Sequence, residues 1–198
     1  MLNRIMFFFY ISFFFVACSS CIPSVSSTDD TSNNTDTEGY SFATWETCSQ
    51  NFGDHPCNFT LQDQNGNEVS LYDFYGDTIV IDFSVTWCGP CNVAASEVQA
   101  VKDAYDANGF AYLTVLVETS QGDAPDSSDC KDWADTYGIT EPVLAGSRDM
   151  IDYSSTNGWP VQGWPTFYFI TDEMVLNTSL RGYSASYIDS LIQDTMGL

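Results

Sequence analysis

The chain has 198 residues, of which 44% are hydrophobic and 16% are charged, a length that suits one buried core plus terminal segments. Its 27 acidic and five basic residues give a formal net charge of −22. This balance argues against a nucleic-acid surface, which depends on many Lys and Arg contacts. The acidic residues predict a strongly hydrated surface, with a basic partner as the alternative.

The first 17 residues predict an export signal. One basic residue, Arg4, precedes an apolar run from Ile5 to Ala17. The run is too short to span a bilayer as a helix, but it has the length of the apolar part of a signal peptide. We therefore expect residues 1–17 to be removed.

The letters "FVAC" at residues 15–18 resemble the lipobox of bacterial lipoproteins. The resemblance implies that Cys18 is diacylated, becomes the new N-terminus and anchors an extracytoplasmic protein in the cell envelope. Phe15 departs from the aliphatic residue that is commoner at its position. A plain signal peptide or a retained anchor therefore remains the alternative.

A tether and one domain are expected after the cysteine. Residues 22–39 consist mainly of Ser, Thr, Asp and Asn, with almost nothing to bury. This composition predicts that residues 18–39 are a disordered acidic tether. Aromatic and branched residues return at Tyr40, so we expect a single domain over residues 40–198.

The first half of this domain predicts a hairpin followed by a strand, a helix and a second strand. "NFTLQDQNGNEVSLYDF" favours a β-hairpin with Asn65 and Gly66 in the turn, because both residues readily take positive φ. "TIVIDFSV" at 78–85 and "FAYLTVLV" at 110–117 are apolar runs typical of central strands. Between them lies one apolar helical stripe, formed by Ala94, Val98, Val101 and Tyr105.

The second half predicts a helix around Cys130–Tyr137, a short strand at 143–144 and a helical turn near Met150. "TFYFIT" and "MVLNTS" form a closing hairpin around Asp172. A C-terminal helix is marked by one apolar face, formed by Ile188, Leu191 and Ile192.

Two cysteine pairs share the CxxC spacing, "CSSC" at 18–21 and "CGPC" at 88–91. Only Cys88 lies where a buried strand ends and a helix begins. Unpaired backbone N–H groups there lower a thiol pKa and raise the thiolate fraction. Pro90 suits the first helical turn, and Cys91 is close enough to close a disulfide with Cys88.

"VIDFSVTWCGPC" at 80–91 resembles the active-site segment of thioredoxin-fold proteins, and "GWPTFYFI" places Pro165 at the cis-proline position of that family. The preceding hairpin and the long segment 121–163 are similar to the TlpA/ResA and peroxiredoxin-like (AhpC/TSA-related) branch. The resemblance covers residues 57–198. It implies an α/β, thioredoxin-like fold, with a central mixed sheet flanked by helices and an N-terminal hairpin extension.

The resemblance also implies roles in disulfide exchange. Cys88 would attack a client disulfide, and Cys91 would resolve the mixed disulfide. Asp82, a buried carboxylate whose neutral form is favoured by desolvation, would accept the Cys91 proton. An alternative is a structural disulfide or half a zinc site, although no second CxxC lies in the globular part.

Trp87, Trp164 and Pro165 would flank the cysteines and bind the client. The implied function is an extracytoplasmic, membrane-tethered thiol-disulfide oxidoreductase that reduces protein disulfides, supplied by a membrane thiol electron donor and using no cofactor or metal. Reduction is favoured over oxidation because thioredoxin, which has the same Gly-Pro dipeptide, has a low potential.

Two alternatives of the same fold are a thiol peroxidase and a copper-handling protein. Peroxiredoxins have a threonine three residues before the reactive cysteine, where this chain has Val85. Copper proteins of the SCO type use CxxxC and a later histidine, whereas His55 is the single histidine here and precedes the cysteines. A lipid-anchored binding domain with an inert disulfide is the last alternative.

The remaining cysteines are expected to be structural. Cys48 and Cys57 bracket eight residues and predict a disulfide in an oxidising compartment. Cys130 is interpreted as a buried apolar residue, with an additional redox thiol as the alternative. Cys21 is left unassigned in the tether.

Overall fold

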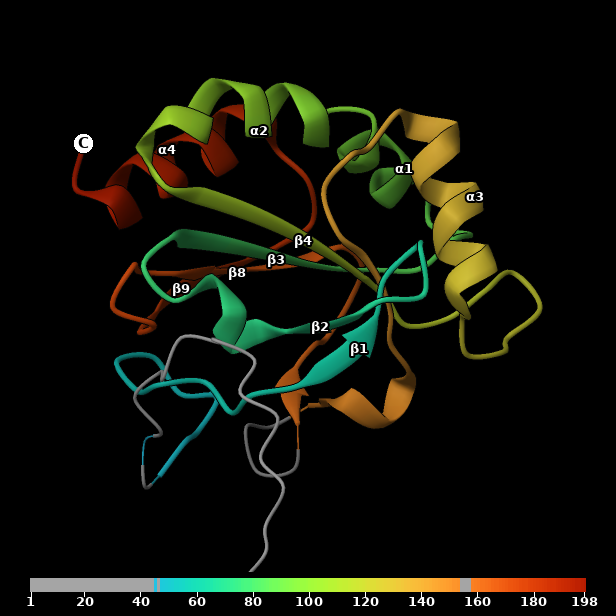
Figure 1. The fold of residues 1–198 in the computed structure, drawn as a ribbon, viewed down its shortest axis with the longest axis horizontal. Helices are drawn as coiled ribbons and strands as arrows, with labels where there is room; N and C mark the ends of the chain where they lie inside the picture. Colours follow the sequence, from blue (N-terminus) through green and yellow to red (C-terminus); the bar gives the residue numbers. More distant parts are fainter. Residues whose placement is uncertain (1–44, 46, 154–157) are drawn as a thin grey trace, which may run out of the picture. The chain divides into compact units, whose positions relative to one another are not determined.

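The computed structural model of the chain describes residue 45 and residues 47–153 and 158–198 (Figure 1). The compact unit to which they belong runs from Tyr40 to Leu198. The predicted signal segment, the lipidation site Cys18, Cys21 and the tether lie outside the described residues. Within the described ranges, every helix is too short or too polar to cross a membrane.

A mixed sheet of five strands, in the order β5-β4-β3-β8-β9, forms the centre of the unit. β3, β4 and β5 are parallel, β8 runs antiparallel to β3, and β9 runs antiparallel to β8. Every residue of β3, β4 and β8 is buried, as their apolar sequences predict. The five strands are β3 Thr78–Ser84, β4 Phe110–Leu116, β5 Val143–Ala145, β8 Thr166–Ile170 and β9 Leu176–Arg181.

Helices α2 and α4 lie side by side over one face of the sheet (Figure 1). The Tyr105 hydroxyl of α2 donates to the Asp189 carboxylate of α4 and joins them. Together with the mixed sheet, this arrangement confirms the predicted thioredoxin-like fold class. The helices are α1 Gly89–Ala95, α2 Val98–Tyr105, α3 Ser127–Tyr137 and α4 Ala185–Met196, with short 3₁₀ turns η1 Leu71–Phe74, η2 Asp106–Asn108 and η3 Arg148–Met150.

The prediction of one continuous helical stripe after the cysteines is wrong, because α1 ends at Ala95 and α2 starts at Val98. The Ser96 hydroxyl donates to the Val93 carbonyl at 2.7 Å and competes with the backbone ladder. The Glu97 N–H bonds the carbonyl only three residues back, so the helix tightens and changes direction.

The predicted N-terminal hairpin is present as β1 Thr60–Gln62 and β2 Glu68–Ser70. Its turn differs from a two-residue Asn-Gly turn, because Gly66 alone takes a positive φ, of 82°. The Asp63 carboxylate accepts hydrogen bonds from the backbone N–H groups of Asn65 and Asn67, each at 2.8 Å. The aspartate thus organises a longer turn.

A short parallel pair, β6 Ile151–Asp152 and β7 Trp159–Pro160, was not predicted. Trp159 is 3% exposed and lies 5.3 Å from Phe83 and 4.9 Å from Tyr168, ring centre to ring centre. Burial of this indole fixes the segment against the sheet. Two residues are too few to form a recognisable strand pattern, so the sequence did not predict this contact.

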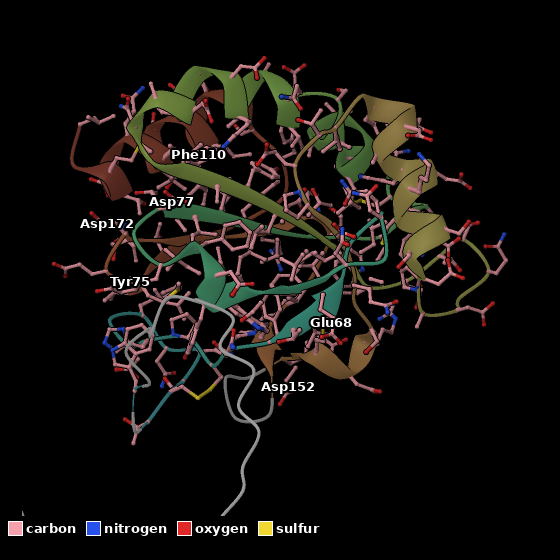
Figure 2. All side chains as sticks on the ribbon, viewed as in Figure 1. Glu68, Tyr75, Asp77, Phe110, Asp152 and Asp172 are labelled. Atoms are coloured by element: carbon pink, nitrogen blue, oxygen red, sulfur yellow. A yellow bond between two sulfur atoms is a disulfide. The ribbon has the colours of Figure 1, made fainter. Side chains whose placement is uncertain are left out.

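The acidic side chains are spread over the described unit. Figure 2 shows Glu68 of β2, Asp152 of β6 and Asp172 of the β8–β9 turn at separate places. These acidic side chains therefore do not all belong to one patch.

Candidate active site

Cys88 and Cys91 form a disulfide at the start of α1. Cys88 caps the helix with an extended backbone, and its Sγ accepts a hydrogen bond from the Cys91 N–H at 3.3 Å. Pro90 occupies the first turn, where it has no N–H to satisfy. Cys88 is 6% exposed and Cys91 is fully buried, so Cys88 is the sulfur that a second molecule can reach. A backbone N–H aimed at Sγ favours the thiolate when the pair is reduced.

Asp82 lies in β3 and is 1% exposed. Burial raises the pKa of its carboxyl to about 7, although the hydroxyls of Ser84 and Tyr112 oppose the shift by donating to it at 2.7 and 3.4 Å. A carboxyl with this pKa exchanges a proton near neutral pH. The sequence identified Asp82, but it did not identify the two hydroxyl donors, which come from residue i+2 of β3 and from β4.

The loop before β8 contains the cis peptide bond Trp164–Pro165. The Pro165 carbonyl accepts from the Gly182 N–H at 2.8 Å, which ties the loop to the end of β9. Thr166, the next residue, pairs with Phe83 near the end of β3, the strand that leads to Cys88. Strand register therefore brings the two sequence motifs to the same edge of the sheet.

An aromatic bridge, defined as Trp87, Glu118, Arg148 and Trp164, connects these loops. The Trp87 Nε1 donates to Glu118 Oε1 at 2.9 Å, and Glu118 Oε2 pairs with the Arg148 guanidinium. That guanidinium lies 5.7 Å from the ring centre of Trp164. The hydrogen bond from Arg148 is the main cause that lowers the pKa of Glu118.

Sequence reasoning selected the two tryptophans of the aromatic bridge and missed the two charged residues between them. Arg148 is one of only five basic residues in the chain, and this rarity was the available signal. Glu118 is one of 27 acidic residues and had no such signal. Trp87 remains 50% exposed, and Val93 of α1 is 52% exposed, so an apolar surface accompanies the cysteine pair.

The other described cysteines, Cys48, Cys57 and Cys130, are not placed for disulfide exchange with a second molecule. Cys48 and Cys57 form a disulfide with a Cα–Cα distance of 4.8 Å. Cys130 is fully buried, and desolvation, followed by nearby aspartates, raises the pKa of its thiol to about 12. These values favour the buried apolar role over an additional redox thiol.

His55 is engaged in packing: its Nδ1 lies 2.8 Å from the Met174 carbonyl, and its ring stacks on Trp45 at 4.0 Å. Among the described residues, no three His, Cys, Asp or Glu side chains gather as a metal site would require.

The sequence of this chain is similar to those of thioredoxin-like proteins and thiol-disulfide oxidoreductases. The sequence pattern of the AhpC/TSA family matches residues 52–179. The thioredoxin-like protein YneN of Bacillus subtilis is 26% identical over 125 residues, which are 63% of this chain and 68% of that protein. The thiol-disulfide oxidoreductase ResA of Bacillus subtilis is 25% identical over 158 residues, 79% of each chain.

The comparison with solved structures supports the fold. An exposed lipoprotein thioredoxin of Streptococcus pneumoniae superposes with a TM-score of 0.57 at 22% identity. The superposition covers 72% of this chain and all of the pneumococcal one. At this identity the similarity is one of fold.

Proposed function

The chain belongs to the AhpC/TSA family as a thioredoxin-fold thiol-disulfide oxidoreductase of the TlpA/ResA type, and from this premise we propose that it reduces disulfides of client proteins through Cys88 and Cys91. The observation that carries the proposal is the position of Cys88. It is the accessible member of the pair, and a backbone N–H directed at its sulfur supports the thiolate.

In the first step, the Cys88 thiolate attacks one sulfur of the client disulfide. The client S–S bond breaks, a bond forms between Cys88 Sγ and that sulfur, and the second client sulfur leaves as a thiolate that takes a proton from water. Trp87, Trp164 and Pro165 are proposed to hold the client segment during this step.

In the second step, Cys91 loses its proton and attacks Cys88 Sγ. The bond between Cys88 Sγ and the client sulfur breaks, and that sulfur leaves as a thiolate that takes a proton from water. The client has then gained two electrons, and Cys88 and Cys91 have been oxidised to a disulfide. Asp82 is proposed to accept the Cys91 proton, since its pKa of about 7 suits transfer near neutral pH. A membrane thiol donor then returns two electrons and two protons to the pair.

The proposed location is the extracytoplasmic side of a bacterial cell envelope, with Cys18 carrying the lipid anchor. The apolar N-terminal run and "FVAC" support it, as does the exposed lipoprotein thioredoxin of Streptococcus pneumoniae among proteins of this fold. The acidic tether would allow the domain to reach clients near the membrane.

Reduction of insulin by dithiothreitol tests the proposal. We expect the wild-type chain to accelerate it and Cys88→Ser to show no acceleration. Cys91→Ser should accumulate a client mixed disulfide that non-reducing electrophoresis detects. Cys130→Ser is the matched control and should retain turnover, because this thiol is buried away from exchange. Turnover that survives Cys88→Ser would contradict the mechanism.

A further inference from the structure

A recess lies beside the loop that contains Pro165. It has a volume of about 420 Å³ and separates the disulfide-bonded N-terminal loop, at Gln50 and Phe52, from the ends of β8 and β9. Tyr168 lines its floor, and its hydroxyl is already committed to the Pro160 carbonyl at 2.6 Å. We call this recess the Arg181 pocket.

The Arg181 pocket is electrostatically unlike the rest of the chain. None of its nine lining residues is acidic, although the chain has 27 acidic residues. Arg181 is exposed, and no described acidic side chain forms an ion pair with it. Its guanidinium is therefore available to a carboxylate from another molecule.

A second polar group points to a peptide ligand. Gln50 is only 9% exposed, and its Oε1 has no hydrogen-bond partner among the described residues. A buried amide oxygen without a donor is costly, and a peptide N–H would satisfy it. Phe52 is 58% exposed and offers an apolar wall to the same ligand.

The Arg181 pocket is connected to the reactive loop by strand pairing. Arg181 pairs with Thr166, the residue after Pro165, and the Gly182 N–H bonds the Pro165 carbonyl. The Arg181 side chain also covers Gly163, since a Cβ at that glycine would lie 3.2 Å from Arg181 Cδ. A peptide that crosses the proline loop therefore passes this guanidinium.

We propose that the Arg181 pocket binds an acidic residue of the client segment whose disulfide Cys88 attacks. The client carboxylate pairs with Arg181, and a neighbouring backbone N–H donates to Gln50 Oε1. This inference rests on the proposed function and specifies its substrate class: disulfides flanked by Asp or Glu.

Three synthetic peptides test the inference, each with one intramolecular disulfide flanked by Asp, Asn or Lys. We expect kcat/KM for the Asp peptide to exceed that for the Asn peptide about fivefold at low salt, the upper range for an exposed ion pair. The preference should disappear in about 1 M salt. Arg181→Gln should abolish it, Arg181→Lys should retain part of it, and Arg181→Glu should favour the Lys peptide.

Lys131→Gln is the matched control, because it removes one exposed positive charge from α3, where Lys131 pairs with Asp135. It should leave the preference intact. Equal kcat/KM for the Asp and Asn peptides, or the same ratio in wild type and Arg181→Gln, would overturn the inference while insulin reduction stands.

Failure of the proposed function has a different signature, namely no Cys88-dependent reduction of insulin or of any peptide. Binding of the three peptides to the Cys88→Ser/Cys91→Ser variant, followed by fluorescence anisotropy, measures the Arg181 pocket without turnover. Preference for the Asp peptide there supports the inference, and equal affinities overturn it.

Discussion

Asp82 is a single carboxyl whose burial has consequences for both stability and chemistry. Its pKa is raised from 3.8 to about 7, mainly by desolvation. The unfolded chain releases this proton near pH 4, whereas the folded chain retains it until about pH 7. The contribution of Asp82 to the free energy of unfolding is therefore unchanged below pH 4, falls by a total of about 4 kcal/mol between pH 4 and 7, and is constant above that range.

Replacement Asp82→Asn should remove this fall. The amide oxygen can still accept from Ser84, whereas the amide NH2 replaces the oxygen that accepts from Tyr112, and the side chain does not ionise. We expect the variant to gain stability relative to wild type as the pH rises from 4 to 8, approaching about 4 kcal/mol of relative gain. Urea unfolding of the oxidised proteins at several pH values measures it. If the free energies of unfolding of the two proteins changed with pH in parallel, the pKa of Asp82 would not be raised by folding, and the prediction would be wrong.

The same replacement should slow the second step of exchange, because Cys91 loses its proposed proton acceptor. Release of client from the mixed disulfide, followed after rapid mixing, should be slower by about tenfold or more and should lose its pH dependence near pH 7. Ser84→Ala is the complementary variant. It removes a hydrogen bond that lowers the pKa of Asp82, so the profile should move to higher pH.

At the scale of elements, the aromatic bridge connects the loop before α1, the segment after β4, η3 and the loop before β8. Its members are separated by up to 77 positions in the chain, from Trp87 to Trp164. An ion pair this near the surface adds little stability by itself. We therefore propose a positioning role for Glu118 and Arg148, in which they fix the orientation of the two indoles.

Arg148→Gln should release Trp164 and leave Glu118 without its cation. We expect KM for insulin to rise about fivefold with little change in kcat, whereas reduction of a small aromatic disulfide stays at the wild-type rate. The pKa of Glu118 should rise, visible as a shifted pH titration of Trp87 fluorescence. Lys131→Gln, which breaks another surface pair, is the control. An equal loss for both substrates would indicate a structural defect.

The Cys48–Cys57 disulfide holds the N-terminal loop against β9, where the Gly53 N–H bonds the Leu176 carbonyl at 2.8 Å. Replacing both cysteines by Ala should lower the free energy of unfolding by about 3 kcal/mol, the value expected for a loop of this size. Because the loop forms one wall of the Arg181 pocket, the Asp-peptide preference should weaken while insulin reduction persists. Unchanged stability in urea would mean that the disulfide constrains little.

At the scale of the whole chain, a net charge of −22 implies self-repulsion in the compact state. Raising the salt from about 20 mM to about 0.5 M shortens the Debye length to a few ångströms and should raise the melting temperature by about 5 °C. Calorimetry in NaCl and in KCl separates screening from specific ion binding. A melting temperature that falls with salt would show that attractive pairs dominate.

The sequence predicted the positions of the main strands along the chain well. β3, β4 and β8 are buried along their whole length, so their sequences are nearly unbroken apolar runs. It failed where side chains compete locally with the backbone, as at Ser96, which divides the expected helix. It also missed β6 and β7, since two-residue strands depend on the packing of Trp159 and not on a periodic pattern.

The sequence by itself determined the cysteine pair, its buried aspartate, the proline downstream and the acidic character of the chain. These features are local: they depend on residue type, on spacing along one strand or helix, and on composition. Only the tertiary structure brought Glu118 and Arg148 between the two tryptophans and placed Arg181 and Gln50 around one recess. Such contacts join residues far apart in the chain, and strand register and loop packing decide them.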